Sequence, residues 1–255
     1  MEIRSRSQRT RTSGVLLAVP FSPSSRGRLT DRDLGRFPRD TLFDRLARAV
    51  CHAGCLPRKE LFEAWEMGRR VRRLFRGGRV VDFGAGHGLL AQVMLLLDDS
   101  SPSALVVDRA LPPSCPKVHE VLVQAWPRLS GRVAFLAIGF EDVELLSTDV
   151  VVSSHACGPL TDRILDRAVA ARARVAVLPC CHELHTCDTG SLTGWVDAAL
   201  AIDIVRATRL EHEGYRIWTQ TIPAGITPRN RLLLGAPPAA CATRGRDDRE
   251  PSAGA

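Results

Sequence analysis

Five short apolar runs constrain the fold of this chain more than any other feature. They span residues 79–83, 104–108, 133–138, 149–153 and 175–178, and helical patterns separate them. Each run is continuously apolar rather than alternating, which is typical of strands buried on both faces of a parallel sheet. Two further strands, predicted at 215–222 and 231–235, form a hairpin. We therefore predict an α/β fold, a Rossmann-like, seven-stranded, doubly wound sheet with an antiparallel final strand, in which the hairpin forms an edge.

The remaining segments predict the domain organisation. Residues 31–76 show two amphipathic helical patterns, the first of which begins at Asp40 or Thr41, so they form an N-terminal helical layer before the sheet domain at 77–235. Residues 1–30 form a basic arm, and residues 236–255 are rich in Ala, Pro, Gly, Arg and Asp. We predict that both ends are disordered.

The charge of the chain is concentrated at its beginning. Residues 1–28 contain six arginines and one glutamate, a net charge of +5 out of +7 for the whole chain. A folded part that is nearly neutral supports a nucleic-acid partner only weakly. Aromatic residues make up only 5% of the chain, which argues against a surface built mainly on aromatic base stacking.

Cysteine content and hydropathy indicate the cellular compartment of the protein. Eight cysteines in 255 residues are too few for a disulfide scaffold, and they include the adjacent pair Cys180 and Cys181. No apolar run approaches the roughly 18 residues that cross a bilayer. We therefore predict a reduced, cytoplasmic protein without a membrane partner.

A glycine-rich loop follows the first predicted strand, with Asp82, Gly84, Gly86 and Gly88 in the run Asp-Phe-Gly-Ala-Gly-His-Gly. Such glycines let the chain turn tightly and let a ligand approach the backbone. A dinucleotide fingerprint needs Gly or Ala at position 89, where this chain has Leu89. Asp82 is also unfavourable beside a pyrophosphate. An acidic residue there suits S-adenosylmethionine (SAM), which carries a sulfonium and an ammonium group but no phosphate.

This motif resembles the first motif of the class I SAM-dependent methyltransferases. The resemblance implies that the loop from Asp82 to Gly88 holds the methionine side of SAM and that Asp108, at the end of the second strand, holds the ribose. It also suggests an acidic residue near the adenine, for which Glu141 and Asp142 are the candidates. A turn role for Asp108, and a helix-capping role for Glu141 or Asp142, remain alternatives.

A second motif narrows the resemblance. Residues 153–162 read Ser-Ser-His-Ala-Cys-Gly-Pro-Leu-Thr-Asp, and residues 179–182 read Pro-Cys-Cys-His. Both are similar to motifs of the tRNA 2′-O-methyltransferases that modify the acceptor stem, and of related methyltransferase-like proteins. The resemblance implies an RNA substrate, a cofactor contact by Ser154, and substrate contacts by Cys157 and Asn230. For Asn230 a β-turn role is the alternative.

Three titratable residues near the predicted strand ends are candidates for catalysis. His155, Asp162 and His182 follow the fourth and fifth strands, at the edge where doubly wound sheets bind ligands. A hydroxyl acceptor must lose a proton, so a positioned base accelerates its methylation. Alternatively, Asp162 caps a helix and the histidines bind loop backbone. Rival functions are methylation of a small molecule or a protein, and a nonenzymatic binding module.

The Cys/His-rich loop raises the question of a metal. Cys180, Cys181, His182, His185 and Cys187 offer soft ligands, with Cys157 in the neighbouring motif. A zinc site needs four converging ligands, and an adjacent Cys-Cys-His lacks the usual spacing of two to four residues between cysteines. We therefore predict no metal.

Overall fold

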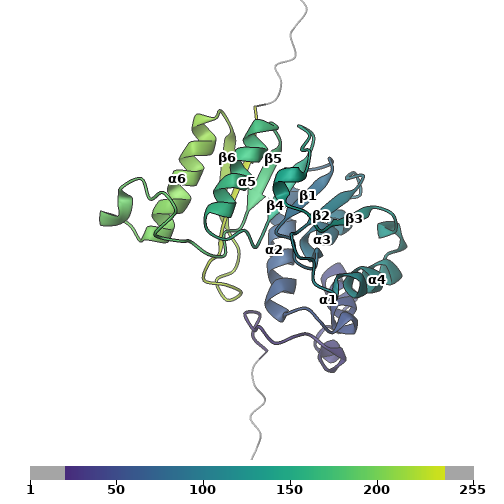
Figure 1. The fold of residues 1–255 in the computed structure, drawn as a ribbon. Helices are drawn as coiled ribbons and strands as arrows, with labels where there is room; N and C mark the ends of the chain where they lie inside the picture. The colour runs from purple at the N-terminus through teal and green to yellow at the C-terminus, as the bar shows by residue number, and fades with distance from the viewer. Residues whose placement is uncertain (1–20, 239–255) are drawn as a thin grey trace, which may run out of the picture.

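The computed structural model describes residues 21–238 and contains one seven-stranded sheet with strand order β3-β2-β1-β4-β5-β7-β6 (Figure 1). The strands are β1 (Val80–Phe83), β2 (Ala104–Val107), β3 (Val133–Leu136), β4 (Val150–Ser153), β5 (Arg174–Val177), β6 (Arg216–Thr221) and β7 (Arg231–Ala236). The α-helices are α1 (Leu42–Ala53), α2 (Arg58–Leu74), α3 (Leu89–Leu97), α4 (Cys115–Ala125), α5 (Pro159–Ala170) and α6 (Ala198–His212). Four 3₁₀ helices complete the described chain, namely η1 (Asp31–Arg36), η2 (Pro127–Leu129), η3 (Phe140–Asp142) and η4 (Leu192–Gly194).

The predicted α/β fold with seven strands and an antiparallel final strand is confirmed. Strands β1 to β5 pair in parallel, and β7 pairs antiparallel with both β5 and β6. Within the predicted hairpin, β7 lies beside β5 and β6 forms the edge of the sheet. A hairpin pattern identifies two strands as partners but does not show which of them joins the rest of the sheet. The strand order reverses between β1 and β4, where doubly wound sheets bind ligands.

Two hydrophobic cores flank the sheet. Val80, Val106 and Val152 face helices α1 to α4, while Val81 and Val151 face α5 and α6. Figure 1 shows α1 and α4 together at one end and α6 beside β6 at the other. Central strands β1 and β4 are buried along their whole length, as predicted, whereas β3 is half-exposed because it lies at an edge.

The N-terminal helical layer begins earlier than predicted. Residues 21–30, part of the predicted arm, pack on this layer, since Leu29 is fully buried and its N–H donates to the carbonyl of Leu56 at 2.9 Å. Thr41 caps α1 by accepting a hydrogen bond from the Asp44 N–H. The rest of the arm and the tail beyond residue 238 lie outside the described residues. Within residues 21–238, the helices are too short or too polar to cross a bilayer.

Candidate functional site

The glycine loop connects β1 to α3 at the carboxyl edge of the sheet. Gly84, Gly86 and Gly88 have φ angles of 63°, 52° and 70°, values that residues with a side chain rarely adopt. A β-carbon at Gly88 would lie 2.6 Å from Val106, so the loop must have glycine there to pack on β2. A β-carbon at Gly86 would meet nothing within 4 Å. The backbone at Gly86 is therefore open to a ligand.

Asp108 supports this loop from the end of β2. Its carboxylate accepts hydrogen bonds from the N–H of Gly86 at 3.0 Å and from the N–H of Ala110 at 3.1 Å. Beside it lies a cavity of about 300 Å³, a size found among small-molecule sites. The lining residues are Gly84, Val107, Asp108, Arg109, Ile138, Phe140, Leu160 and Arg163. Asp108 thus combines the turn role left open above with a position on the cavity wall.

Asp82 lies behind the glycine loop. Its side chain is almost fully buried, and one carboxylate oxygen accepts a hydrogen bond from the N–H of Ala91 in α3 at 3.2 Å. The other oxygen has no hydrogen-bond partner among residues 21–238. Burial raises the pKa of Asp82 to about 8. The residue fixes α3 against β1, and its predicted contact with the methionine end of SAM stays a prediction.

The segment after β3 contributes an aromatic residue to the cavity. Glu141 and Asp142 both lie in η3, and Glu141 forms ion pairs with Arg109 at 2.9 Å and Arg163 at 2.7 Å. The cavity is lined by Phe140 instead. Phe140 was not predicted from the sequence, although an aromatic residue shortly after a strand was an available signal.

A second, much smaller hollow lies on the other side of the glycine loop. It is lined by Glu60, Ala64, Ala85, His87, Leu89, Leu90, Ser154 and His155. The carboxylate of Glu60 is 4.0 Å from His155 Nε2 and 3.9 Å from His87 Nδ1. Ser154 and His155 therefore lie where the sequence predicted, at the end of β4. Glu60 was missed, because nothing in an amphipathic helix pattern shows which polar residue faces a loop more than 20 residues away.

The electrostatics of this hollow suit proton transfer. Burial raises the pKa of Glu60 from 4.5 to about 7, and the neighbouring Glu63 adds to the shift. Burial also lowers the pKa of His155, with a further contribution from Lys59. Groups that titrate near neutrality are characteristic of general acid–base sites. The Glu60 carboxylate is therefore a candidate proton-transfer group beside the glycine loop, near His155 Nε2 at 4.0 Å but not hydrogen-bonded to it.

His182 and Asp162 are occupied by structural contacts. The side chain of His182 is only 2% exposed, and its Nε2 bonds Asp203 of α6 at 2.7 Å. Asp162 accepts two hydrogen bonds from the buried Arg206, at 2.9 and 2.8 Å. Asp162 thus pairs with Arg206 instead of capping α5, and His182 bonds a side chain instead of loop backbone, so neither contact is the one that its architectural alternative named. Their predicted catalytic roles stay predictions.

Asn230 closes the loop between β6 and β7. Its side-chain amide donates to the carbonyl of Ile222 at 2.8 Å, and its own carbonyl accepts from the N–H of the same residue. These bonds close the base of the loop, whereas the turn itself lies at residues 224–226, so Asn230 is not the turn residue that the alternative described. A substrate contact by Asn230 stays a prediction.

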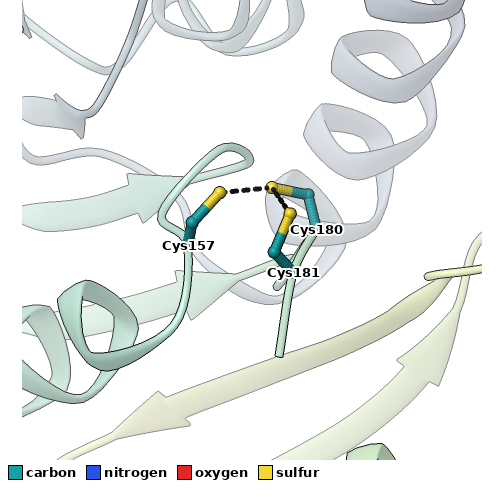
Figure 2. Close-up of side chains that lie close together, drawn as sticks. All are labelled: Cys157, Cys180 and Cys181. Carbon is teal, nitrogen blue, oxygen red and sulfur yellow. Dashed lines mark hydrogen bonds between the residues drawn. The ribbon is translucent and has the colours of Figure 1, made fainter. Parts of the chain in front are cut away.

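Cys157 lies beside the two adjacent cysteines of the β5 loop, and the three side chains point toward one another (Figure 2). The sulfur atoms of Cys157 and Cys180 are 3.1 Å apart, and those of Cys180 and Cys181 are 3.7 Å apart. Burial raises the pKa of Cys157 and of Cys180, so neither thiol is an activated nucleophile. The cluster combines residues that the sequence assigned to two separate motifs.

Comparison with known proteins gives a family match within the chain. A family model described as a methyltransferase domain matches residues 69–188, which contain the glycine loop, Asp108 and both strand-end motifs. A glutathione S-transferase C-terminal domain-containing protein from Xenopus laevis is 32% identical over 201 residues, which are 63% of this chain and 31% of the relative. The chain therefore spans about a third of the length of that curated relative.

Solved structures with a similar fold include methyltransferases. The SAM-dependent methyltransferase SibL, in its apo form, is 20% identical, with 80% of this chain and 65% of that chain covered and a TM-score of 0.48. An O-methyltransferase family protein from Burkholderia thailandensis is 16% identical, with 81% of this chain and 67% of that chain covered and a TM-score of 0.42.

Proposed function

We propose that this chain is a SAM-dependent methyltransferase that acts on RNA. The observation that carries the proposal is a cavity at the reversal point of the sheet, lined by Gly84 and by Asp108, whose carboxylate also accepts from the N–H of the open Gly86. The methyltransferase-domain match over residues 69–188 supports the same reaction class.

The residues around this cavity fit SAM. Gly84 and Gly86 leave room at the backbone, Asp108 offers a carboxylate for ribose hydroxyls, and Phe140 offers an aromatic face for the adenine. When bound, SAM supplies an electrophilic methyl group on a sulfonium. The chain must then exclude water and orient the acceptor, and alignment alone contributes on the order of 7–11 kcal/mol to such bimolecular reactions.

His155 and Glu60 manage the proton of a hydroxyl acceptor in this proposal. His155 is kept neutral by its lowered pKa, so it can accept the proton at Nε2. Glu60, 4.0 Å from that nitrogen, then stabilises the imidazolium. A positioned base of this kind contributes about 10²–10⁴-fold. Asp162 and His182 instead hold the surrounding loops.

RNA is the proposed acceptor because of two sequence features. The strand-end motifs resemble those of tRNA 2′-O-methyltransferases, and residues 1–20 contain four arginines and one glutamate, a net charge of +3. The RNA proposal is tested against two alternatives. One is methylation of a small molecule or a protein, and the other is a nonenzymatic SAM-binding module.

The first experiment separates these outcomes. Purified protein is incubated with methyl-labelled SAM and, in parallel, with total RNA, protein extract and metabolite extract from the source cells. We expect label in RNA, whereas label in another fraction would replace RNA as the acceptor. Calorimetry should detect heat with SAM and S-adenosylhomocysteine (SAH) but none with NAD. Tight NAD binding without SAM binding would overturn the cofactor assignment, and SAM binding without any labelled fraction would favour the binding module.

A second experiment tests the basic arm. Because residues 21–30 pack on the helical layer, the deletion should end at residue 20. A protein that contacts fewer phosphates releases fewer counterions when it binds RNA. The deletion should therefore weaken RNA binding and flatten its salt dependence, while SAH binding stays unchanged. An identical salt slope in both proteins would mean that the arm does not touch RNA.

A further inference from the structure

The cysteine cluster has the dimensions of a metal site. Zinc–sulfur bonds of about 2.3 Å in a tetrahedral site place the sulfur atoms about 3.8 Å apart. In this structure two sulfur pairs are separated by 3.1 and 3.7 Å, and all three sulfur atoms lie within 4.8 Å of one another. Enclosing an ion therefore requires shifts of no more than about 1 Å, which rotation about the side-chain bonds supplies.

The two loops that carry the cysteines are tied together. The N–H of Gly158 donates to the carbonyl of Cys181 at 3.2 Å, and the buried Arg206 donates to the carbonyl of Gly158 at 2.9 Å. His182, the residue after Cys181, is hydrogen-bonded to Asp203 of α6. Supporting contacts of this kind hold ligands in position before an ion arrives.

The local charge favours a cation. A β-carbon at Gly158 would lie 2.6 Å from the carboxyl carbon of Glu183, so this carboxylate packs directly beside the Cys157 loop. Once they lose their protons to the binding of an ion, three cysteines beside a carboxylate attract a soft divalent ion more strongly than Mg²⁺ or Ca²⁺, which prefer oxygen ligands.

We infer that Cys157, Cys180 and Cys181 bind one Zn²⁺ ion at the carboxyl edge of the sheet. Three protein ligands leave the fourth position for water or for a donor atom of a substrate, as in catalytic rather than closed structural zinc sites. Cys181 is exposed, so the fourth position is open to solvent. This inference reverses the sequence-based expectation of no metal, which rested on the unusual spacing of the adjacent Cys-Cys-His and could not show that Cys157 lies against Cys180.

The inference is tested with tag-free protein, fully reduced so that all eight thiols react in denaturant. Zinc is titrated against a chromophoric chelator, and Co²⁺ is used as a spectroscopic probe of thiolate ligation. We expect one ion per chain, with thiolate-to-cobalt charge-transfer absorption. Zinc should also protect Cys157, Cys180 and Cys181 from alkylation while Cys55 continues to react.

Two single substitutions provide the comparison. Cys181→Ser, at an exposed position, should weaken zinc binding at least about 100-fold, the upper end of the loss seen on removing an outer-shell partner. Cys55→Ser, in the helical layer, should bind like the wild type. Equal affinity in all three proteins, or no zinc uptake by the reduced wild type, would overturn the inference. SAH binding is measured in parallel, so a failed cofactor assignment is distinguished from a failed zinc site.

Discussion

Replacing Glu60 with Gln should stabilise the protein at alkaline pH and impair its turnover. A carboxyl whose pKa rises from 4.5 to about 7 keeps its proton in the folded state at pH values where the unfolded chain has lost it. Stability therefore falls as pH rises from about 4.5 to about 7, and above that range the ionised side chain carries its full cost. At 1.36 kcal/mol per tenfold change, this cost is about 1 kcal/mol at pH 5 and about 3 kcal/mol at pH 8.

Gln has nearly the shape of a protonated Glu and does not ionise, so the variant avoids this cost. For a chain of this size 1 kcal/mol corresponds to about 2–4 °C in Tm. The Glu60 side chain is 26% exposed, so screening by solvent reduces the effect, and we expect a gain of about 6 °C at pH 8 but only about 2 °C at pH 5. Thermal unfolding without added ligand measures both values, independently of the substrate.

The matched control is Glu66→Gln in the same helix. Glu66 pairs with Arg70 and Arg69, so its loss should lower the free energy of unfolding by less than about 1 kcal/mol at both pH values. On the labelled acceptor fraction, turnover of Glu60→Gln should fall about 10²-fold, the low end of the contribution of a general base. A Tm gain that is absent, or equal at pH 5 and pH 8, would refute the electrostatic reasoning, and unchanged turnover would remove Glu60 from the mechanism.

Further variants separate cofactor binding, scaffold and chemistry. Gly88→Ala should lower the free energy of unfolding by more than about 2 kcal/mol in denaturant titrations, because of the overlap with β2 and the positive φ. Gly86→Val carries only the backbone strain but should abolish the heat of SAH binding, and retained binding would mean that the ligand lies elsewhere. His182→Ala should lower Tm while turnover per folded molecule is unchanged, whereas His155→Ala should keep the Tm and lose about 10²-fold in turnover. Full activity in a stable His155→Ala protein would contradict the base.

Local features of the chain were predictable from the sequence. The strand at 104–108 begins at the predicted residue, Ala104, and a helix separates it from the first strand as predicted, because apolar runs and glycines are local signals. The same holds for the loop from Asp82 to Gly88, since its shape is required by three glycines in sequence.

The contacts between distant segments were not predictable in this way. Glu60 meets His155 only because α2 packs on α3 and the glycine loop. Cys157 meets Cys180 because β4 and β5 are parallel neighbours whose carboxyl ends lie side by side. Such contacts depend on strand order and helix orientation, and neither can be derived from the spacing of residues within one motif. For the same reason the sequence could propose His182 and Asp162 as bases but not show that Asp203 and Arg206 hold them.

The position of β7 affects how the chain folds while it is being synthesised. β7 lies between β5 and β6 although it follows both in the chain. The sheet therefore cannot be completed until residues 231–236 have emerged from the ribosome. Until then β5 presents an unpaired edge, which is a site for aggregation or chaperone capture. A stop codon just before Arg231 would therefore leave β6 without a partner as well as removing one strand.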